Sequence, residues 1–212
     1  MMRFEAKSAA LLLIDLQVGF CSPEGHTGKK IDVSGFNPVL ESARRLAEAS
    51  RAVGMPVIFT TMAFAPDYSN GGLTTSELRP NLPVENALRD DRPDREIMPI
   101  LNPQPEDDII EKQRYSAMIK SPLPALLEKR GIDRVVVGGV TTSMCVESTV
   151  RDMAMMDYRV FVVPEACGDL RPEFHENSMY MFKTAFGRVV PEADMLLAIE
   201  AGAADFAHQT LT

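Results

Sequence analysis

The sequence predicts a three-layer α/β fold built around a parallel β-sheet. Six short apolar runs recur along the 212 residues, and most of them are rich in Val and Ile. Runs that are apolar on both faces are typical of strands buried between two layers of helices. Longer stretches with apolar residues at helical spacing separate several of these runs. Such an alternation of strand and helix predicts a parallel sheet with right-handed crossovers.

The predicted strands follow one another in chain order. They are residues Ala9–Asp15, Val57–Thr61, Asp108–Glu111, Arg134–Gly138, Val160–Val163 and Arg188–Val190. In open α/β sheets, ligands bind beyond the carboxyl ends of the strands. Polar residues at the ends of these runs are therefore the first candidates for a functional site.

The predicted helices lie between and after these strands. They cover Pro38–Val53, Ser121–Arg130, Ser143–Met156, Pro172–Ala185 and Pro191–Glu200. The first of them ends before Gly54 and Pro56, which are typical of a helix cap and a stop. Residues Ala63–Asn102 have no clear periodicity and contain Gly71-Gly72 and several prolines. A loop of this length in a compact domain usually covers or forms a site.

Composition and charge narrow the class of protein. Hydrophobic residues make up 45% of the chain, and no linker interrupts it, so we predict a single domain over residues 1–212. The net charge of −8 without a basic block argues against nucleic acid or an anionic membrane as partner. The first apolar run is too short to span a membrane. Three cysteines, an odd number, favour a reducing compartment, and we predict a cytoplasmic protein.

Three polar residues stand at the predicted strand ends. Asp15 ends the first strand, Lys112 follows the third, and Cys145 begins the helix after the fourth. A helix start favours the thiolate form of a cysteine. Taken alone, Cys145 is as readily a small buried core residue, Asp15 is readily a turn aspartate, and Lys112 is more commonly a solvated surface lysine. Together they predict a nucleophilic thiol, a carboxylate base and a charged partner. The turn from Val140 to Met144 offers backbone N–H groups that could stabilise an oxyanion.

Metal and cofactor motifs are missing from the sequence. His26, His175 and His208 form no ligand spacing typical of zinc or iron. There is neither a GxGxxG motif at a helix start nor a GxxxxGK[ST] motif. We therefore expect neither a metal nor a cofactor, and a small molecule as the substrate.

Three segments resemble the isochorismatase-like cysteine hydrolase superfamily in the right order. They are LLLIDLQVGFCSPEG with Asp15, EKQRYSAM with Lys112, and VVVGGVTTSMCVESTVRD with Cys145. The resemblance runs from about Ala9 to Glu200. It implies a six-stranded parallel sheet with Rossmann-like topology, a catalytic triad of these three residues, and a homo-oligomer, dimer or tetramer. It also implies a cis peptide at Val140-Thr141 and an oxyanion hole formed there with the Cys145 amide.

The resemblance also bears on the substrate. Nicotinamidases of this superfamily carry an Asp-x-His metal motif after the second strand, whereas FTTMAFAPDYSNGG here has no histidine. The stretch is more similar to the carbamoylsarcosine and maleamate amidohydrolase branch. That branch often has Gly-Asp-Arg after the fifth strand, with the arginine on a substrate carboxylate. Here the segment is Gly168-Asp169-Leu170-Arg171, with the arginine one position later.

We therefore predict a hydrolase that cleaves a C–N bond of a small amide or N-carbamoyl carboxylic acid through a covalent acyl-enzyme. The candidate substrate contacts are Phe20, Arg114, Tyr115, Thr141 and Arg171. One alternative is a vinyl-ether hydrolase of the isochorismatase type, whose members commonly lack the cysteine. Another is a non-catalytic binding or scaffold member of the superfamily.

Overall fold

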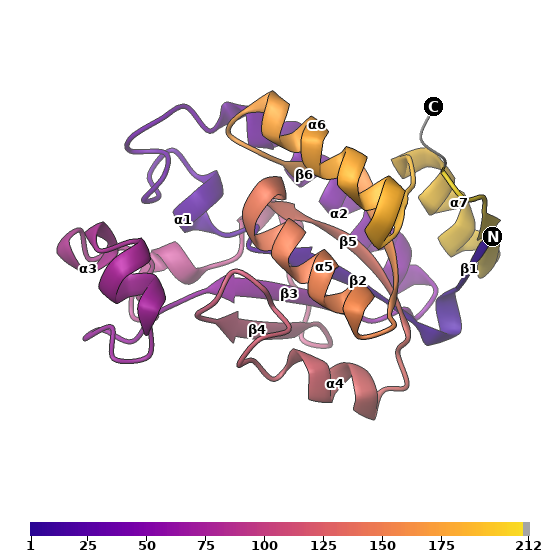
Figure 1. Ribbon diagram of the computed structural model, residues 1–212, viewed down its shortest axis with the longest axis horizontal. Helices are drawn as coiled ribbons and strands as arrows, with labels where there is room; N and C mark the ends of the chain where they lie inside the picture. Colours follow the sequence, from indigo (N-terminus) through magenta and orange to yellow (C-terminus); the bar gives the residue numbers. More distant parts are fainter. Residues whose placement is uncertain (210–212) are drawn as a thin grey trace.

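The computed structural model describes residues 1–209, so the last three residues of the predicted 1–212 domain lie outside it. Its centre is a six-stranded sheet with the order β4-β3-β2-β5-β6-β7, in which every neighbouring pair is parallel (Figure 1). The strands are β2 (Ala9–Ile14), β3 (Val57–Met62), β4 (Asp108–Lys112), β5 (Arg134–Val140), β6 (Arg159–Gly168) and β7 (Arg188–Val189). Each lies on one of the six predicted runs, which confirms the predicted fold class.

Helices cover both faces of the sheet. The helices α4 (Leu123–Lys129), α5 (Glu147–Met155) and α6 (Pro172–Met181) pack on one face, and α2 (Asn37–Ala52) and α7 (Glu192–Ala201) on the other (Figure 1). Strand β2 supplies both cores, because Leu11 and Leu13 join the α2 side while Leu12 and Ile14 join the α5 side. Burying each such side chain contributes about 1.5–3 kcal/mol. This two-sided burial explains why the run is apolar throughout.

Two features were not predicted. The strands β1 (Met2–Glu5) and β8 (Ala203–Phe206) pair in an antiparallel ribbon near the termini, away from α1 and α3 (Figure 1). Both are short and only partly buried, so they carry no clear hydrophobic period. The predicted helices 143–156 and 172–185 also each contain a wide π-helical turn, at Thr142–Val146 before α5 and at Phe182–Phe186 after α6.

The sheet has a topological switch point between β2 and β5. From β2 the chain proceeds to β3 on one side, and from β5 it proceeds to β6 on the other. Glycine is required at Gly139 in β5, because its φ is +144° and a Cβ atom there would lie 2.3 Å from the Ile14 carbonyl oxygen. The crevice outside such a switch point is where open α/β sheets bind ligands.

The predicted irregular segment covers this crevice together with the short helix α1 (Val18–Cys21). It contains a π-helical turn (Thr74–Leu78), α3 (Asn81–Val84) and two 3₁₀ turns (Pro93–Arg95 and Pro99–Leu101). A small apolar cluster of its own, including Phe64, Leu82 and Leu88, holds it together. We refer to residues 63–102 as the covering segment.

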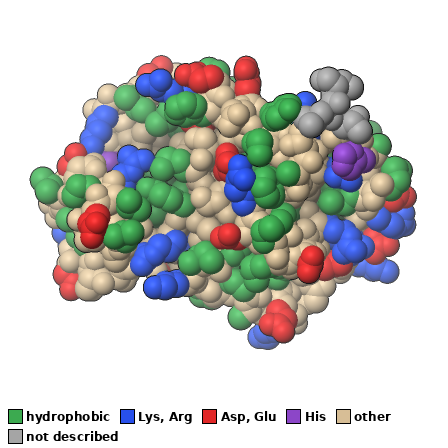
Figure 2. Space-filling model, in the orientation of Figure 1, with side chains coloured by type: hydrophobic (Ala, Val, Ile, Leu, Met, Phe, Trp, Pro, Cys, Tyr) green, Lys and Arg blue, Asp and Glu red, His purple; other side chains and the backbone are tan. Residues whose placement is uncertain are grey.

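The surface carries both signs of charge. On the face that bears α5 and α6, Lys and Arg lie among Asp and Glu rather than in a continuous basic stripe (Figure 2). Within residues 1–209, no helix combines the length and apolar character needed to cross a membrane.

Candidate active site

Asp15 lies directly after β2, at the switch point, and is fully buried. Its backbone has φ of +55°, a left-handed conformation that aspartate tolerates better than most residues. The neighbouring strand β3 fixes both ends of the residue. The Asp15 amide donates to the Thr60 carbonyl at 3.0 Å, and the Thr60 hydroxyl donates to Asp15 Oδ1 at 2.7 Å. The carboxylate is therefore held in one orientation, with Oδ2 left to face other partners.

Lys112 ends β4, two strands away from β2, and reaches across β3 to Asp15. Its Nζ lies 2.7 Å from Asp15 Oδ2 and donates to the Arg114 carbonyl at 3.0 Å. Both charged side chains are fully buried. Burial acts to lower the pKa of Lys112, but its interactions with the Asp15 charge and its hydrogen bonding to Asp15 and Cys145 outweigh it and raise that pKa. The ammonium group is therefore a fixed positive charge beneath the crevice.

Cys145 lies in the π-helical turn that follows β5. A second carboxylate anchors this turn, because the Ser143 amide donates to Asp169 Oδ2 at 2.8 Å. The Thr149 hydroxyl donates to the Cys145 carbonyl at 2.7 Å and ties the turn to α5. Asp15 and Lys112 both act on the Cys145 thiol through charge and hydrogen bonding. The three residues that the sequence singled out thus come together in one cluster.

The protonation state of Cys145 differs from the expectation for a helix start. Burial raises the pKa of the thiol, and although the Lys112 charge lowers it, the Asp15 charge raises it further. The residue precedes α5 within the wide turn, and only 5% of it is exposed. Loss of hydration therefore outweighs the helix terminus, so the resting side chain is a thiol rather than a thiolate.

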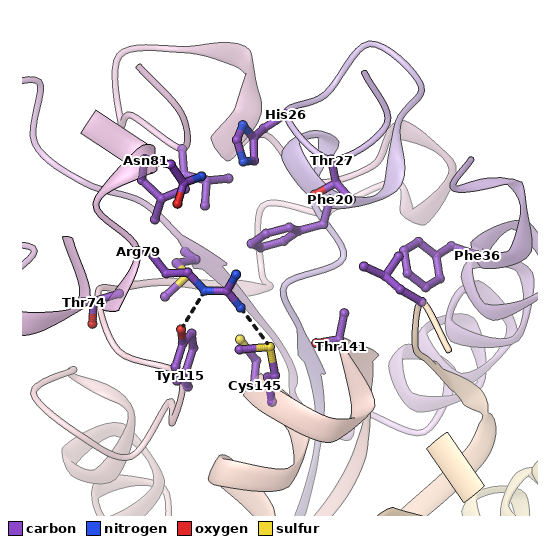
Figure 3. Close-up of a pocket in the computed structure, with 15 residues that line it drawn as sticks. Phe20, His26, Thr27, Phe36, Thr74, Arg79, Asn81, Tyr115, Thr141 and Cys145 are labelled. Atoms are coloured by element: carbon purple, nitrogen blue, oxygen red, sulfur yellow. Dashed lines mark hydrogen bonds between the residues drawn. The ribbon is translucent and has the colours of Figure 1, made fainter. Parts of the chain in front are cut away.

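A cavity of about 170 Å³ opens above Cys145 (Figure 3). That volume is below the range typical of drug-sized ligand pockets, so it suits a small molecule. Most of its walls are apolar or aromatic, and the covering segment supplies one side. The lining residues are Phe20, His26, Thr27, Phe36, Met62, Thr74, Arg79, Asn81, Leu82, Leu88, Tyr115, Thr141, Met144, Cys145 and Leu170.

Three of the five predicted substrate contacts line this cavity: Phe20, Tyr115 and Thr141. The two arginines do not, and these expectations need correction. Arg114 points toward the covering segment, where it donates to the Gly71 carbonyl at 2.8 Å. The Arg171 side chain is 67% exposed beside Glu173, because the additional residue Leu170 lines the cavity in its place.

The predicted oxyanion turn closes the floor of the cavity. The peptide bond between Val140 and Thr141 is cis. Thr141 and Cys145 line the cavity, whereas Val140 is buried in the core on the α2 side. The amides of Ser143 and Met144 are already occupied by Asp169 and the Thr141 carbonyl. Those two amides are therefore unsuitable as oxyanion donors.

Three residues that support or line the site were missed in the sequence. Thr60 orients Asp15, and Gln17 is a buried brace that bonds to the backbone of Met62 and Asp94. Thr60 pairs with Ile14 in the neighbouring strand, so strand pairing could have indicated it. Gln17 lies two residues after Asp15 in the first motif, and that position is its signal. Arg79 lies in the covering segment, where no periodicity indicates which side chains face inward.

Within residues 1–209, no group of three or more His, Cys, Asp and Glu side chains is placed to hold a metal ion. His26 lies beside Glu85 at 3.4 Å, and His175 contacts the Thr142 hydroxyl at 3.0 Å. The two histidines thus contact different partners at separate places.

The thiol form of Cys145 leads to a prediction about its reactivity with pH. A free cysteine has a pKa of about 8.5. Because the pKa of Cys145 is raised above that value, its rate of alkylation by iodoacetamide should keep rising as the pH passes it. Mass spectrometry of the Cys145 peptide measures this rate. In urea-unfolded protein the rate should level off near that ordinary value. Burial also raises the pKa of Cys21 and Cys167 to about 12, and neither lines the cavity, so their labelling should stay slow. A plateau at neutral pH in the folded protein would contradict the prediction.

Comparison with known proteins agrees with this architecture. Residues 9–194 match the isochorismatase domain family. The ureidoacrylate amidohydrolase RutB of Acinetobacter baylyi is 33% identical over 199 residues, which cover 86% of this chain and 80% of that protein. A cysteine hydrolase from Pseudomonas syringae superposes with a TM-score of 0.87 at 26% identity, covering 94% of this chain and 95% of that one.

An isochorismatase family protein from Desulfovibrio vulgaris superposes with a TM-score of 0.79, also at 26% identity, covering 92% of this chain and 97% of that one. The family match spans all three motifs and both strands of the switch point. This chain is therefore a hydrolase that belongs to the isochorismatase-like cysteine hydrolase superfamily.

Proposed function

We propose that this hydrolase cleaves the C–N bond of a small amide or N-carbamoyl carboxylic acid through a covalent thioester at Cys145. The observation that carries the proposal is the buried Asp15–Lys112 pair beneath a thiol at the floor of a small, mostly apolar cavity. The likeness to RutB supports it, because that relative is a ureidoacrylate amidohydrolase.

In the first half of the reaction, Asp15 takes the proton of the Cys145 thiol as sulfur attacks the carbonyl carbon. Asp15 Oδ2 suits this role, since among residues 1–209 it accepts no hydrogen bond of regular geometry despite its contact with Lys112. The carbonyl electron pair moves to oxygen and forms an oxyanion. The Cys145 amide and an amide from Thr141 or Thr142 are the candidate donors to that oxyanion.

The intermediate then collapses and the C–N bond breaks. The leaving nitrogen takes the proton from Asp15, which restores the carboxylate. In the second half, Asp15 takes a proton from water while the water oxygen attacks the thioester carbon. The sulfur leaves and is reprotonated by Asp15. Lys112 stays positively charged throughout, so it stabilises Asp15 when ionised and any negative charge on sulfur.

The proposal is tested by ammonia release from a panel of small acids. The panel contains succinamate, N-carbamoyl-β-alanine and N-carbamoylglycine. A vinyl-ether acid represents the alternative, and its loss is followed by chromatography because its C–O cleavage releases no ammonia. We expect ammonia from at least one amide or carbamoyl acid and a transient mass increase on the Cys145 peptide. Turnover of the vinyl ether alone, or none in the whole panel, would contradict the proposal. The homo-oligomeric state and the cytoplasmic location stay predictions.

A further inference from the structure

The charge of the cavity is one-sided. Among the residues within 1–209 that line the cavity, Arg79 is the only Lys or Arg, and none is Asp or Glu. The Asp15 charge lies beneath the floor and is already paired with Lys112. Although Arg79 is exposed to solvent, its positive charge stands beside largely apolar walls with no acidic lining residue to oppose it, and this favours an anionic ligand.

The guanidinium of Arg79 has donors to spare. Its Nε donates to the Tyr115 hydroxyl at 3.3 Å, and Nη2 contacts Met144 Sδ, a weak acceptor, at 3.6 Å. Within residues 1–209 it has no carboxylate partner within 4.0 Å, unlike Arg89 and Arg95 of the same segment, which pair with Asp91 and Glu111. A guanidinium presents five N–H donors, so most of its fork is available to a ligand.

The local backbone directs the Arg79 guanidinium group toward the Cys145 side of the cavity. The Arg79 amide donates to the Thr74 carbonyl at 2.8 Å, and Pro80 follows, so the backbone is held at the end of the π-helical turn. From there the side chain points into the cavity between Tyr115 and the turn that carries Cys145 (Figure 3). Because the Tyr115 oxygen accepts from Arg79, its own O–H remains free to donate to the same ligand.

We infer that Arg79, together with the Tyr115 hydroxyl, binds the carboxylate of the substrate and so selects short acids over neutral amides. This inference rests on the proposed function. An acid whose carboxylate lies on Arg79 places its amide or carbamoyl carbon over Cys145 only if few bonds separate the two groups, since the cavity is small. Arg79 thus takes the role that the sequence had suggested for Arg171 or Arg114.

Succinamate and succinamide provide the matched pair for the test, because they differ only in a carboxylate exchanged for an amide. Wild-type protein should prefer succinamate, and Arg79→Met should raise its KM by about 10- to 100-fold, the range of a lost hydrogen bond to a charged group. The values for succinamide should stay unchanged. Arg79→Lys should recover part of the loss, since it keeps the charge without the fork. The control is Arg171→Met, an arginine outside the cavity, which should behave as wild type.

A binding measurement separates this inference from the proposed chemistry. Calorimetry on Cys145→Ser protein, with and without Arg79→Met, measures the affinity for succinamate and succinamide without turnover. If succinamate binding depended on Arg79 while wild-type protein hydrolysed no acid of the panel, the role of Arg79 in carboxylate binding would stand and the proposed function would be overturned. If wild-type protein hydrolysed succinamate and succinamide equally well, or if Arg79→Met left the KM for succinamate unchanged, the role of Arg79 would be overturned and the proposed function would stand. If neither succinamate nor succinamide bound to Cys145→Ser protein, the role of Arg79 in carboxylate binding would also be overturned.

Discussion

Replacing Cys145 with alanine should reduce kcat by about 10⁴-fold or more, the size of the loss when a catalytic nucleophile is removed. Without the sulfur no thioester forms, and water would have to attack the amide directly. Asp15 and Lys112 would keep their own contact, because neither depends on the thiol for its position. The measurement is steady-state ammonia release on the best acid of the panel, with circular dichroism as a check on folding.

A second buried cysteine provides the control. Cys167 lies in β6 outside the cavity. Its Sγ donates a weak hydrogen bond to the Val137 carbonyl oxygen at 3.9 Å. Cys167→Ala should keep wild-type kcat even if it costs some stability. Asp15→Asn should lose activity as Cys145→Ala does. If Cys145→Ala still cleaved the vinyl-ether acid while Asp15→Asn did not, the enzyme would instead use the vinyl-ether chemistry that needs only the acid.

The fold was readable from the sequence because burial on both faces leaves a direct signal. Strand β2 must be apolar at every position, since its alternate residues pack into two separate hydrophobic cores. The same logic brought Asp15 and Lys112 to one rim, as the ends of parallel strands share an edge. Even β7, only two residues long, stands on a predicted run. The β1–β8 ribbon left no such signal, because its strands are short and most of their residues are only partly buried.

The cavity walls were not readable in the same way. In a loop, the direction of a side chain depends on local turns rather than on a period, so no pattern indicated that the exposed Arg79 faces the cavity. One additional residue, Leu170, is enough to move Arg171 from the cavity to solvent. The thiol state of Cys145 was also missed. A sequence indicates a helix start but not how completely the folded chain removes water from it.

Replacing Lys112 with methionine should destabilise the protein by about 3–5 kcal/mol, because it leaves a buried carboxylate without its counter-charge. Asp15 and Lys112 have no exposed surface, so water cannot take the place of the lost partner. The Arg114 carbonyl would also lose its donor. Urea unfolding followed by circular dichroism measures the change in the free energy of unfolding.

The double variant Asp15→Asn/Lys112→Met identifies the cause. Removing both charges at once removes the unpaired carboxylate, so it should cost clearly less than the sum of the two single changes.

An exposed pair on the same strand provides the comparison. Glu111 precedes Lys112 in β4 and pairs with Arg95 at 2.6 Å, where both side chains are more than 40% exposed. Arg95→Met should therefore change stability by about 0–1 kcal/mol. If Lys112→Met cost no more than Arg95→Met, the buried pair would not carry the stability that its geometry implies. The additive result in the double variant would lead to the same conclusion, because it would show that the two charges do not interact.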